Sequence, residues 1–177
     1  LSFLAKADDP NSGGRQMPQH YGHKDLRIVS QSSPTGTQFL QAVGCAMSRK
    51  WENDHEIVYV SSGEGSTSEG EFHEALNWAS REKLPIIFHI QDNEYAISVH
   101  VSEQTSGSSV FSMVNGYDNL SRYEVDGTNF FETDLAFREA IERARQGKGP
   151  SVIVSNVVRL LSHSSSDDQK KYRKKED

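Results

Sequence analysis

Three short, nearly continuous apolar runs alternate with helical segments along this chain. The apolar runs are 57–60, 86–90 and 151–158. Helical periodicity of apolar residues marks 35–50, about 68–83 and about 133–146. A strand that is apolar at almost every position is typical of a parallel sheet covered on both faces. The order of strands and helices therefore predicts an α/β fold with a doubly wound parallel sheet.

Length and composition narrow the class of protein. A chain of 177 residues fits one domain, and we treat 1–177 as a single unit. The net charge of −6 and the lack of a basic face argue against nucleic acid as a partner. Without an apolar run of 18 residues, we expect a soluble, intracellular protein with no membrane partner. Because the first residue is Leu1 and not Met, we expect a piece of a longer chain.

The run 57–60 leads into a turn with the sequence Gly63-Glu64-Gly65-Ser66, and a helix follows. Ligands of open α/β sheets bind at the carboxyl ends of the strands, where this turn lies. Glycines allow the backbone to approach a phosphate, and the helix N-terminus supplies donors. Because a carboxylate repels a phosphate, Glu64 indicates that a hard cation such as Mg²⁺ or Ca²⁺ lies between them. The alternative is a tight turn with no ligand.

A second polar turn follows the next strand. Asp92, Asn93 and Glu94 come directly after the run 86–90, and they precede Tyr95. Successive parallel strands bring both turns to the same edge of the sheet. Glu64 and Asn93 could then give two oxygen ligands to one ion, and diphosphate and water would complete an octahedron.

The two turns resemble the thiamine-diphosphate signature, which is usually Gly-Asp-Gly followed at a similar distance by Asn-Asn. The sequence around them is similar to alpha subunits of the 2-oxo-acid dehydrogenases, and most similar to the branched-chain members. The segments that carry the resemblance are 14–22, 32–38, 41–44, 69–77, 83–85, 95–98 and 162–168. The resemblance runs from Gly14 to Asp168 and implies a thiamine-diphosphate-binding fold.

The resemblance also implies a set of site residues. The Mg²⁺ ligands would be Glu64, Asn93 and the carbonyl of Tyr95. The cofactor-binding residues would be Gly63, Glu64, Gly65, Ser66, Asn93, Tyr95, Ala96, Ile97, Ser33 and Thr35. In some relatives a loop that matches Ser32, Pro34, Thr37 and Gln38 binds potassium. As bare sequence, Ser33 or Thr35 could cap the following helix, and capping is compatible with contact to the cofactor.

His163 is the catalytic residue that the resemblance assigns to this chain. It would bind or protonate the 2-oxo acid and assist reductive acyl transfer to lipoyl, work that suits an imidazole near neutral pH. The alternative is a solvated histidine in a polar tail. We expect 162–177 to form a mobile active-site loop, because Tyr172 is the one large side chain that it could bury.

The implied reaction is oxidative decarboxylation of a 2-oxo acid with transfer of the acyl group to lipoyl, in an alpha–beta heterotetramer. The glutamate that tautomerises the aminopyrimidine of the cofactor would come from the beta subunit, so we expect no activity without that partner. A lipoyl-bearing acyltransferase would be the next partner. The expected compartment is the cytoplasm for a bacterial protein and the mitochondrial matrix for a eukaryotic one.

Four departures from the family pattern keep alternatives open. Asp92 replaces the usual first Asn, and Glu94 replaces the usual Gly. Gln91 stands where branched-chain members carry an arginine that faces the phosphates, and Thr35 replaces a larger apolar residue that supports the bent cofactor. The same-class alternative is a pyruvate or acetoin dehydrogenase alpha subunit. The other alternative is a scaffold domain that has kept the fold and lost the cofactor.

Overall fold

The computed structural model describes residues 1–17 and 20–174, and its centre is a four-stranded parallel sheet. The strands are β1 (Val58–Gly63), β2 (Ile86–Asp92), β5 (Ser121–Asp126) and β6 (Ser151–Asn156). Their order across the sheet is β1-β2-β6-β5. Pro18 and Gln19 of the segment 14–22 lie outside the described residues, as do 175–177 of the expected loop 162–177.

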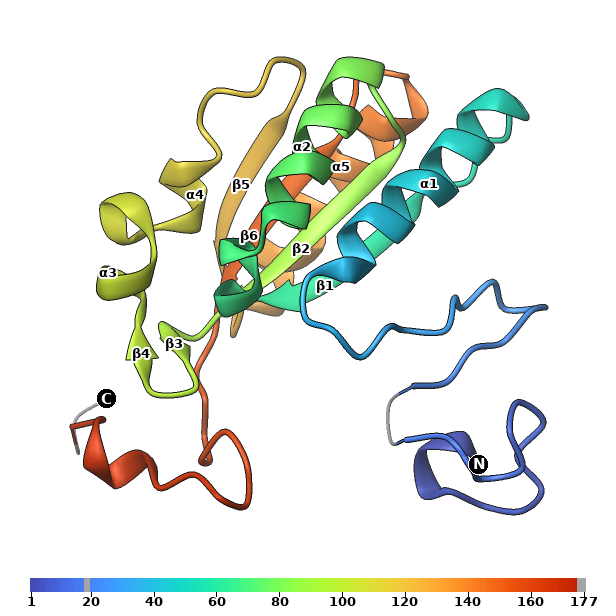
Figure 1. Cartoon of the computed structure of the whole chain (residues 1–177). Coiled ribbons are helices and arrows are strands. Elements are labelled where there is room, and N and C mark those ends of the chain that lie inside the picture. Colours follow the sequence, from blue (N-terminus) through green and yellow to red (C-terminus); the bar gives the residue numbers. More distant parts are fainter. Residues whose placement is uncertain (18–19, 175–177) are drawn as a thin grey trace.

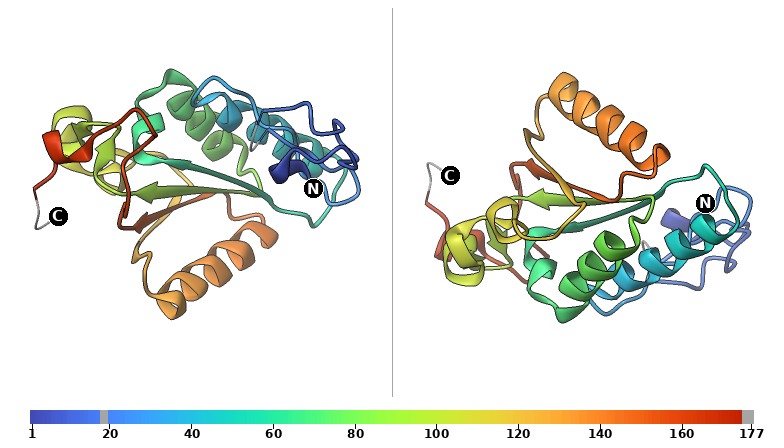
Figure 2. Two further views of the ribbon diagram at one scale, coloured as in Figure 1. Left: turned by 90° about the horizontal axis from the view of Figure 1, so that it is seen from below. Right: turned by 90° about the horizontal axis from the view of Figure 1, so that it is seen from above.

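Three long helices cover the two faces of the sheet. These helices are α1 (Thr37–Trp51), α2 (Gly70–Glu82) and α5 (Phe130–Arg145). Helices α1 and α2 lie side by side on one face, and α5 lies on the other (Figures 1 and 2). The expected α/β class with a doubly wound parallel sheet is therefore confirmed.

Shorter elements connect the layers. Between β2 and β5 the chain forms a hairpin of β3 (Tyr95–Ala96) and β4 (Val99–His100), followed by α3 (Val101–Gln104) and α4 (Val110–Met113). The 3₁₀ helices are η1 (Ser2–Leu4), η2 (Glu64–Ser68), η3 (Ser106–Ser108) and η4 (Gln169–Lys171). Among the described residues, no helix has the length and apolar character that a membrane span requires.

The core between the sheet and the helix pair is built on three phenylalanines. The ring centroid of Phe39 on α1 lies 4.9 Å from that of Phe72 on α2 and 6.2 Å from that of Phe88 on β2. All three side chains are fully buried. Because Phe72 lies near the start of α2, directly after the turn between β1 and α2, its burial fixes where that turn ends.

The fourth strand, β5, was not predicted from the sequence, and the helices α2 and α5 begin at residues other than those predicted. β5 is an edge strand that pairs only with β6, and polar residues alternate along it, so it lacks a continuous apolar run. α5 begins at Phe130 and not near Thr133, because the Asn129 side chain caps the N–H groups of Phe131 and Glu132. α2 begins at Gly70 and not near Ser68, since η2 precedes it.

The expectation that Ser33 or Thr35 caps α1 is wrong. The N-cap residue is Gly36, whose φ of 93° lies in the left-handed region, and the cap has no side-chain hydrogen bond. A Cβ on Gly36 would come within 2.8 Å of the Glu69 Cβ. The close approach of Gly36 to Glu69 therefore brings the start of α1 against the end of η2.

Candidate functional site

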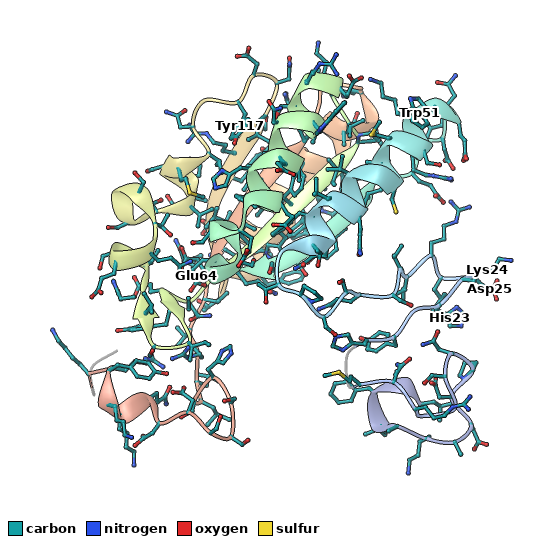
Figure 3. The ribbon with its side chains drawn as sticks, viewed as in Figure 1. His23, Lys24, Asp25, Trp51, Glu64 and Tyr117 are labelled. Carbon is teal, nitrogen blue, oxygen red and sulfur yellow. The ribbon has the colours of Figure 1, made fainter. Side chains whose placement is uncertain are left out.

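The site lies where β1 and β2 end side by side. The two strands pair in parallel, with Gly63 opposite Gln91, so the residues after each strand emerge at one edge of the sheet. Glu64 begins η2 after β1, and Asn93 follows β2. Figure 3 shows Glu64 at this edge, where the sheet, α2 and the hairpin meet, whereas Trp51 lies at the far end of α1.

Glu64 is a buried carboxylic acid with one oxygen unsatisfied. Its side chain is 1% exposed. Oε2 accepts a hydrogen bond from the main-chain N–H of Asn93 (3.2 Å), whereas Oε1 is buried without a hydrogen-bond partner among the described residues. Burial raises the pKa of Glu64, although the Asn93 N–H and the Arg159 guanidinium act in the opposite direction. An unpaired carboxylate oxygen inside a protein is costly unless a proton or a cation satisfies it.

The second turn is ordered by its own side chains. Asp92 is buried, and its Oδ1 accepts from the Glu94 N–H (2.8 Å). Burial raises the pKa of Asp92, and the nearby Glu94 carboxylate adds to this effect. Asn93 Oδ1 accepts from the Tyr95 N–H at 3.3 Å. The Asn93 N–H and side chain therefore connect the Glu64 turn to the start of the hairpin.

The hairpin packs closely on the Glu64 turn. A Cβ on Gly65 would lie 2.8 Å from the Ala96 Cβ, so the residue at this position must lack a side chain. Glu94 has a φ of 67° and Ile97 a φ of 57°, both in the left-handed region that glycine prefers. The Glu94 side chain is exposed, and its Oε2 lies 4.0 Å from His100 Nε2. Its carboxylate is thus directed to solvent and to His100.

Serine hydroxyls tie the Glu64 turn to α1. Ser66 Oγ lies 2.5 Å from Ser62 Oγ and donates to the Gly63 carbonyl (2.8 Å). Gln38 Nε2 donates to Ser62 Oγ (3.2 Å), and Gln38 Oε1 accepts from the Gly36 N–H (3.1 Å). The side chains of Gln38 and Ser62 thus link the N-terminus of α1 to the turn.

The other expected site residues lie in segments on either side of this edge. Ser33 is exposed, and its Oγ lies 2.8 Å from His20 Nε2. Thr35 is also exposed. His163 is exposed as well, and its main-chain N–H donates to Asp167 Oδ2 (2.8 Å). The structure thus brings Gly63–Ser66 together with Asn93 and the hairpin, whereas Ser33 bonds to His20, His163 bonds to Asp167, and Thr35 is exposed.

Arg159 connects the C-terminal segment to the hairpin, a role that the sequence analysis missed. Its guanidinium donates to the Ile97 carbonyl (2.8 Å) and to Tyr172 Oη (2.7 Å). It also lies over the rings of Tyr95 and Tyr172, 5.5 Å and 5.6 Å from their centroids. A lone arginine six residues after Ile153, at the centre of an apolar strand, gave no signal of this contact, because its partner Ile97 is distant in the sequence.

The oxygen atoms at this edge of the sheet suit a hard cation that is bound jointly with an anionic molecule. Glu64 Oε1, the Asn93 amide oxygen and a main-chain carbonyl are the oxygen ligands that Mg²⁺ prefers. Among residues 1–17 and 20–174, no group of three or more His, Cys, Asp or Glu side chains could hold a metal ion alone. A cation here would therefore need ligands from a bound molecule, and the backbone at the start of η2 and α2 suits a phosphate.

Known proteins match most or all of this chain in sequence. The family of dehydrogenase E1 components matches residues 1–177. The chain is 45% identical over 177 residues to the 2-oxoisovalerate dehydrogenase subunit alpha of Bacillus subtilis, covering all of this chain and 53% of that protein. It is 42% identical over 166 residues to the mitochondrial 2-oxoisovalerate dehydrogenase subunit alpha of Mus musculus, covering 94% of this chain and 37% of that protein.

Two further comparisons extend these matches. The 3-methyl-2-oxobutanoate dehydrogenase subunit alpha of Mycobacterium tuberculosis is 39% identical over 146 residues, which cover 82% of this chain and 40% of that protein. The chain thus spans about half of the Bacillus relative's length and less of the other two. An X-ray structure described as a thiamin diphosphate-dependent enzyme from Mycobacterium smegmatis matches with a TM-score of 0.56. It is 24% identical and covers 75% of this chain and 24% of that chain, which supports the fold alone.

Proposed function

Because the chain belongs to the family of dehydrogenase E1 components, we propose that it is the cofactor-binding part of a 2-oxo-acid dehydrogenase alpha subunit. The proposed reaction is oxidative decarboxylation of a 2-oxo acid with acyl transfer to lipoyl. The proposed substrates are branched-chain 2-oxo acids, in line with the names of the Bacillus, mouse and Mycobacterium tuberculosis relatives.

The observation that carries the proposal is the unsatisfied Oε1 of Glu64. A buried acid with a raised pKa and a free oxygen is costly in a purely structural turn, but it is useful for holding a cation. We propose Glu64, Asn93 and the Tyr95 carbonyl as ligands of Mg²⁺. The Gly63, Gly65 and Ser66 backbone would face the diphosphate, and Ala96 and Ile97 would lie beside it.

The remaining residues have proposed roles at the reacting end of the cofactor. Thiamine diphosphate, when bound, would supply the carbon nucleophile and the electron sink that decarboxylation requires. Ser33 and Thr35 would lie against the aminopyrimidine. His163 would bind or protonate the substrate, and its exposed position leaves it accessible. Potassium binding by the loop of Ser32, Pro34, Thr37 and Gln38 stays a prediction.

We propose that this chain holds half of an active site. No carboxylate of this chain is assigned to the aminopyrimidine, so a beta subunit would supply it, and a lipoyl-bearing acyltransferase would accept the acyl group. The proposed compartment is the mitochondrial matrix for a eukaryotic source and the cytoplasm for a bacterial one. The two alternatives, a pyruvate or acetoin enzyme and a scaffold domain, differ from this proposal in substrate and in cofactor binding respectively.

The exposed position of Glu94 favours the enzyme over the scaffold. A carboxylate directed into the site would repel a diphosphate, whereas this one lies near His100. Gln91 is exposed and uncharged, so it offers less compensation to phosphate than an arginine would. We therefore expect cofactor binding that depends strongly on the cation.

Calorimetry with thiamine diphosphate and Mg²⁺, on the full-length protein together with its beta subunit, tests the proposal. Glu64→Gln keeps the size of the side chain but removes its charge, so we expect at least about tenfold weaker binding of the cofactor. Glu74→Gln is the matched control, because Glu74 is exposed on α2. If the wild-type assembly bound no cofactor, the scaffold alternative would replace the enzyme.

A further inference from the structure

Gln104 reaches back from the end of α3 to the Glu64 turn. Its side-chain Nε2 donates to the Gly65 carbonyl (2.9 Å) and to Ser68 Oγ (2.8 Å). Both acceptors belong to η2, more than thirty residues earlier in the chain. A single carboxamide therefore uses both of its N–H groups on the segment that carries Glu64.

The Gly65 carbonyl controls the direction of the next amide. The carbonyl of Gly65 and the N–H of Ser66 belong to one planar trans peptide unit, so they point in opposite directions. A side chain that holds the carbonyl oxygen therefore also fixes where the Ser66 N–H points, which is away from Gln104. Glycine at position 65 would otherwise allow this peptide unit to rotate more freely than any other residue would.

The segment that carries Gln104 is itself anchored next to the second turn. The Val101 N–H donates to the Glu94 carbonyl (2.8 Å), and the Val101 side chain is buried. The Asn93 N–H, at the other end of the same segment, donates to Glu64 Oε2. The stretch 93–104 thus holds the Glu64 turn at two points, the carboxylate through Asn93 and the following peptide unit through Gln104.

We propose that Gln104 is a positioning residue that aims the Ser66 N–H at an anionic phosphate ligand of the Glu64 turn. This inference rests on the proposed function for the identity of the ligand, thiamine diphosphate with Mg²⁺. Gln104 contacts neither the ligand nor the cation. It acts through the Gly65–Ser66 peptide unit.

The test compares three variants of the full-length protein in its assembly. Gln104→Ala removes both hydrogen bonds, and Gln104→Glu keeps the size but turns a carboxylate toward the Gly65 carbonyl. Ser68→Ala is the matched control, because it removes the second acceptor and leaves the bond to Gly65. We measure cofactor affinity in the presence of Mg²⁺ by calorimetry, hydrogen exchange of the peptide that contains Ser66, and the melting temperature.

We expect both Gln104 variants to bind thiamine diphosphate about tenfold more weakly, the change that loss of one hydrogen bond of about 1.4 kcal/mol produces. Exchange at Ser66 should be faster in ligand-free Gln104→Ala, and Ser68→Ala should stay within about twofold of wild type in affinity. A lower melting temperature with unchanged affinity and exchange would reduce Gln104 to a structural role and overturn the inference. If wild type bound no cofactor, the proposed function would fail, and the exchange data would still decide whether Gln104 orients the Ser66 peptide.

Discussion

The imidazole of His89 is held inside the sheet by one hydrogen bond at each ring nitrogen. His89 on β2 is 9% exposed, with Nδ1 2.8 Å from Tyr59 Oη and Nε2 2.9 Å from Ser155 Oγ. A neutral imidazole donates through one nitrogen and accepts through the other, and both hydroxyls can take either role. The neutral form is therefore fully satisfied. Burial disfavours the charged form and lowers the pKa of His89.

The lowered pKa predicts a loss of stability in acid. As the pH falls below about 6.5, the usual histidine pKa, the unfolded chain takes up a proton before the folded one does, so the free energy of unfolding decreases until the folded-state pKa is reached. One such proton contributes a slope of at most about 1.4 kcal/mol per pH unit. Urea titrations between pH 5 and 8 should show a flatter slope for His89→Gln, whereas His55→Gln, which changes an exposed histidine, should match wild type. Equal slopes for wild type and His89→Gln would refute the assignment.

At the scale of elements, the β3–β4 hairpin combines backbone strain with close packing on the Glu64 turn. Glu94 and Ile97 both adopt positive φ, a conformation that costs about 1 kcal/mol or more for a residue with a side chain. The hairpin nevertheless packs Ala96 against Gly65 and places Tyr95 next to Asn93. Strained residues of this kind cluster at binding sites, where surrounding contacts hold them.

Relief of this strain should stabilise the ligand-free protein. Glu94→Gly removes the strain and the charge, whereas Glu94→Ala removes the charge and keeps the Cβ that causes the strain. We expect Glu94→Gly to exceed Glu94→Ala by about 1 kcal/mol in the free energy of unfolding, because glycine adopts this φ without cost. Chemical denaturation without ligand measures the difference, and identical stabilities would mean that the backbone at Glu94 is not strained.

The elements that the sequence predicted are those with a strong local signal. β1, β2 and β6 carry apolar runs, and the ends of β1 and β2 place Glu64 and Asn93 at one edge of the sheet. β5 has a single neighbouring strand in the sheet, and polar and apolar residues alternate along it, so the sequence did not predict it. The contacts of Gln104 and Arg159 join residues that are far apart in the chain, and no local pattern encodes them.

At the scale of the whole molecule, the C-terminal segment and the turns form one connected structure. Arg159 bonds to the hairpin carbonyl of Ile97 and to Tyr172, and Tyr172 Oη also donates to Asp167 Oδ2 (2.6 Å). Arg173 donates to the Arg159 carbonyl (2.6 Å). The order of 159–173 thus depends on the same hairpin that carries the proposed Tyr95 ligand. In Figure 1 this segment lies beyond the hairpin, next to the carboxyl edge of the sheet.

Binding at the Glu64 turn should therefore protect the C-terminal segment from proteolysis. Trypsin cleavage after Lys170, which is exposed, should slow by about fivefold when Mg²⁺, thiamine diphosphate and the beta subunit are present, the change in open population that about 1 kcal/mol produces. Arg159→Lys keeps the charge but loses the planar guanidinium that donates to both Ile97 and Tyr172. The ligands should therefore protect this variant less from cleavage after Lys170. Cleavage after Lys148, at the opposite edge of the sheet, serves as the internal control and should not change. Equal rates after Lys170 with and without the ligands would show that the hairpin does not transmit binding to this segment.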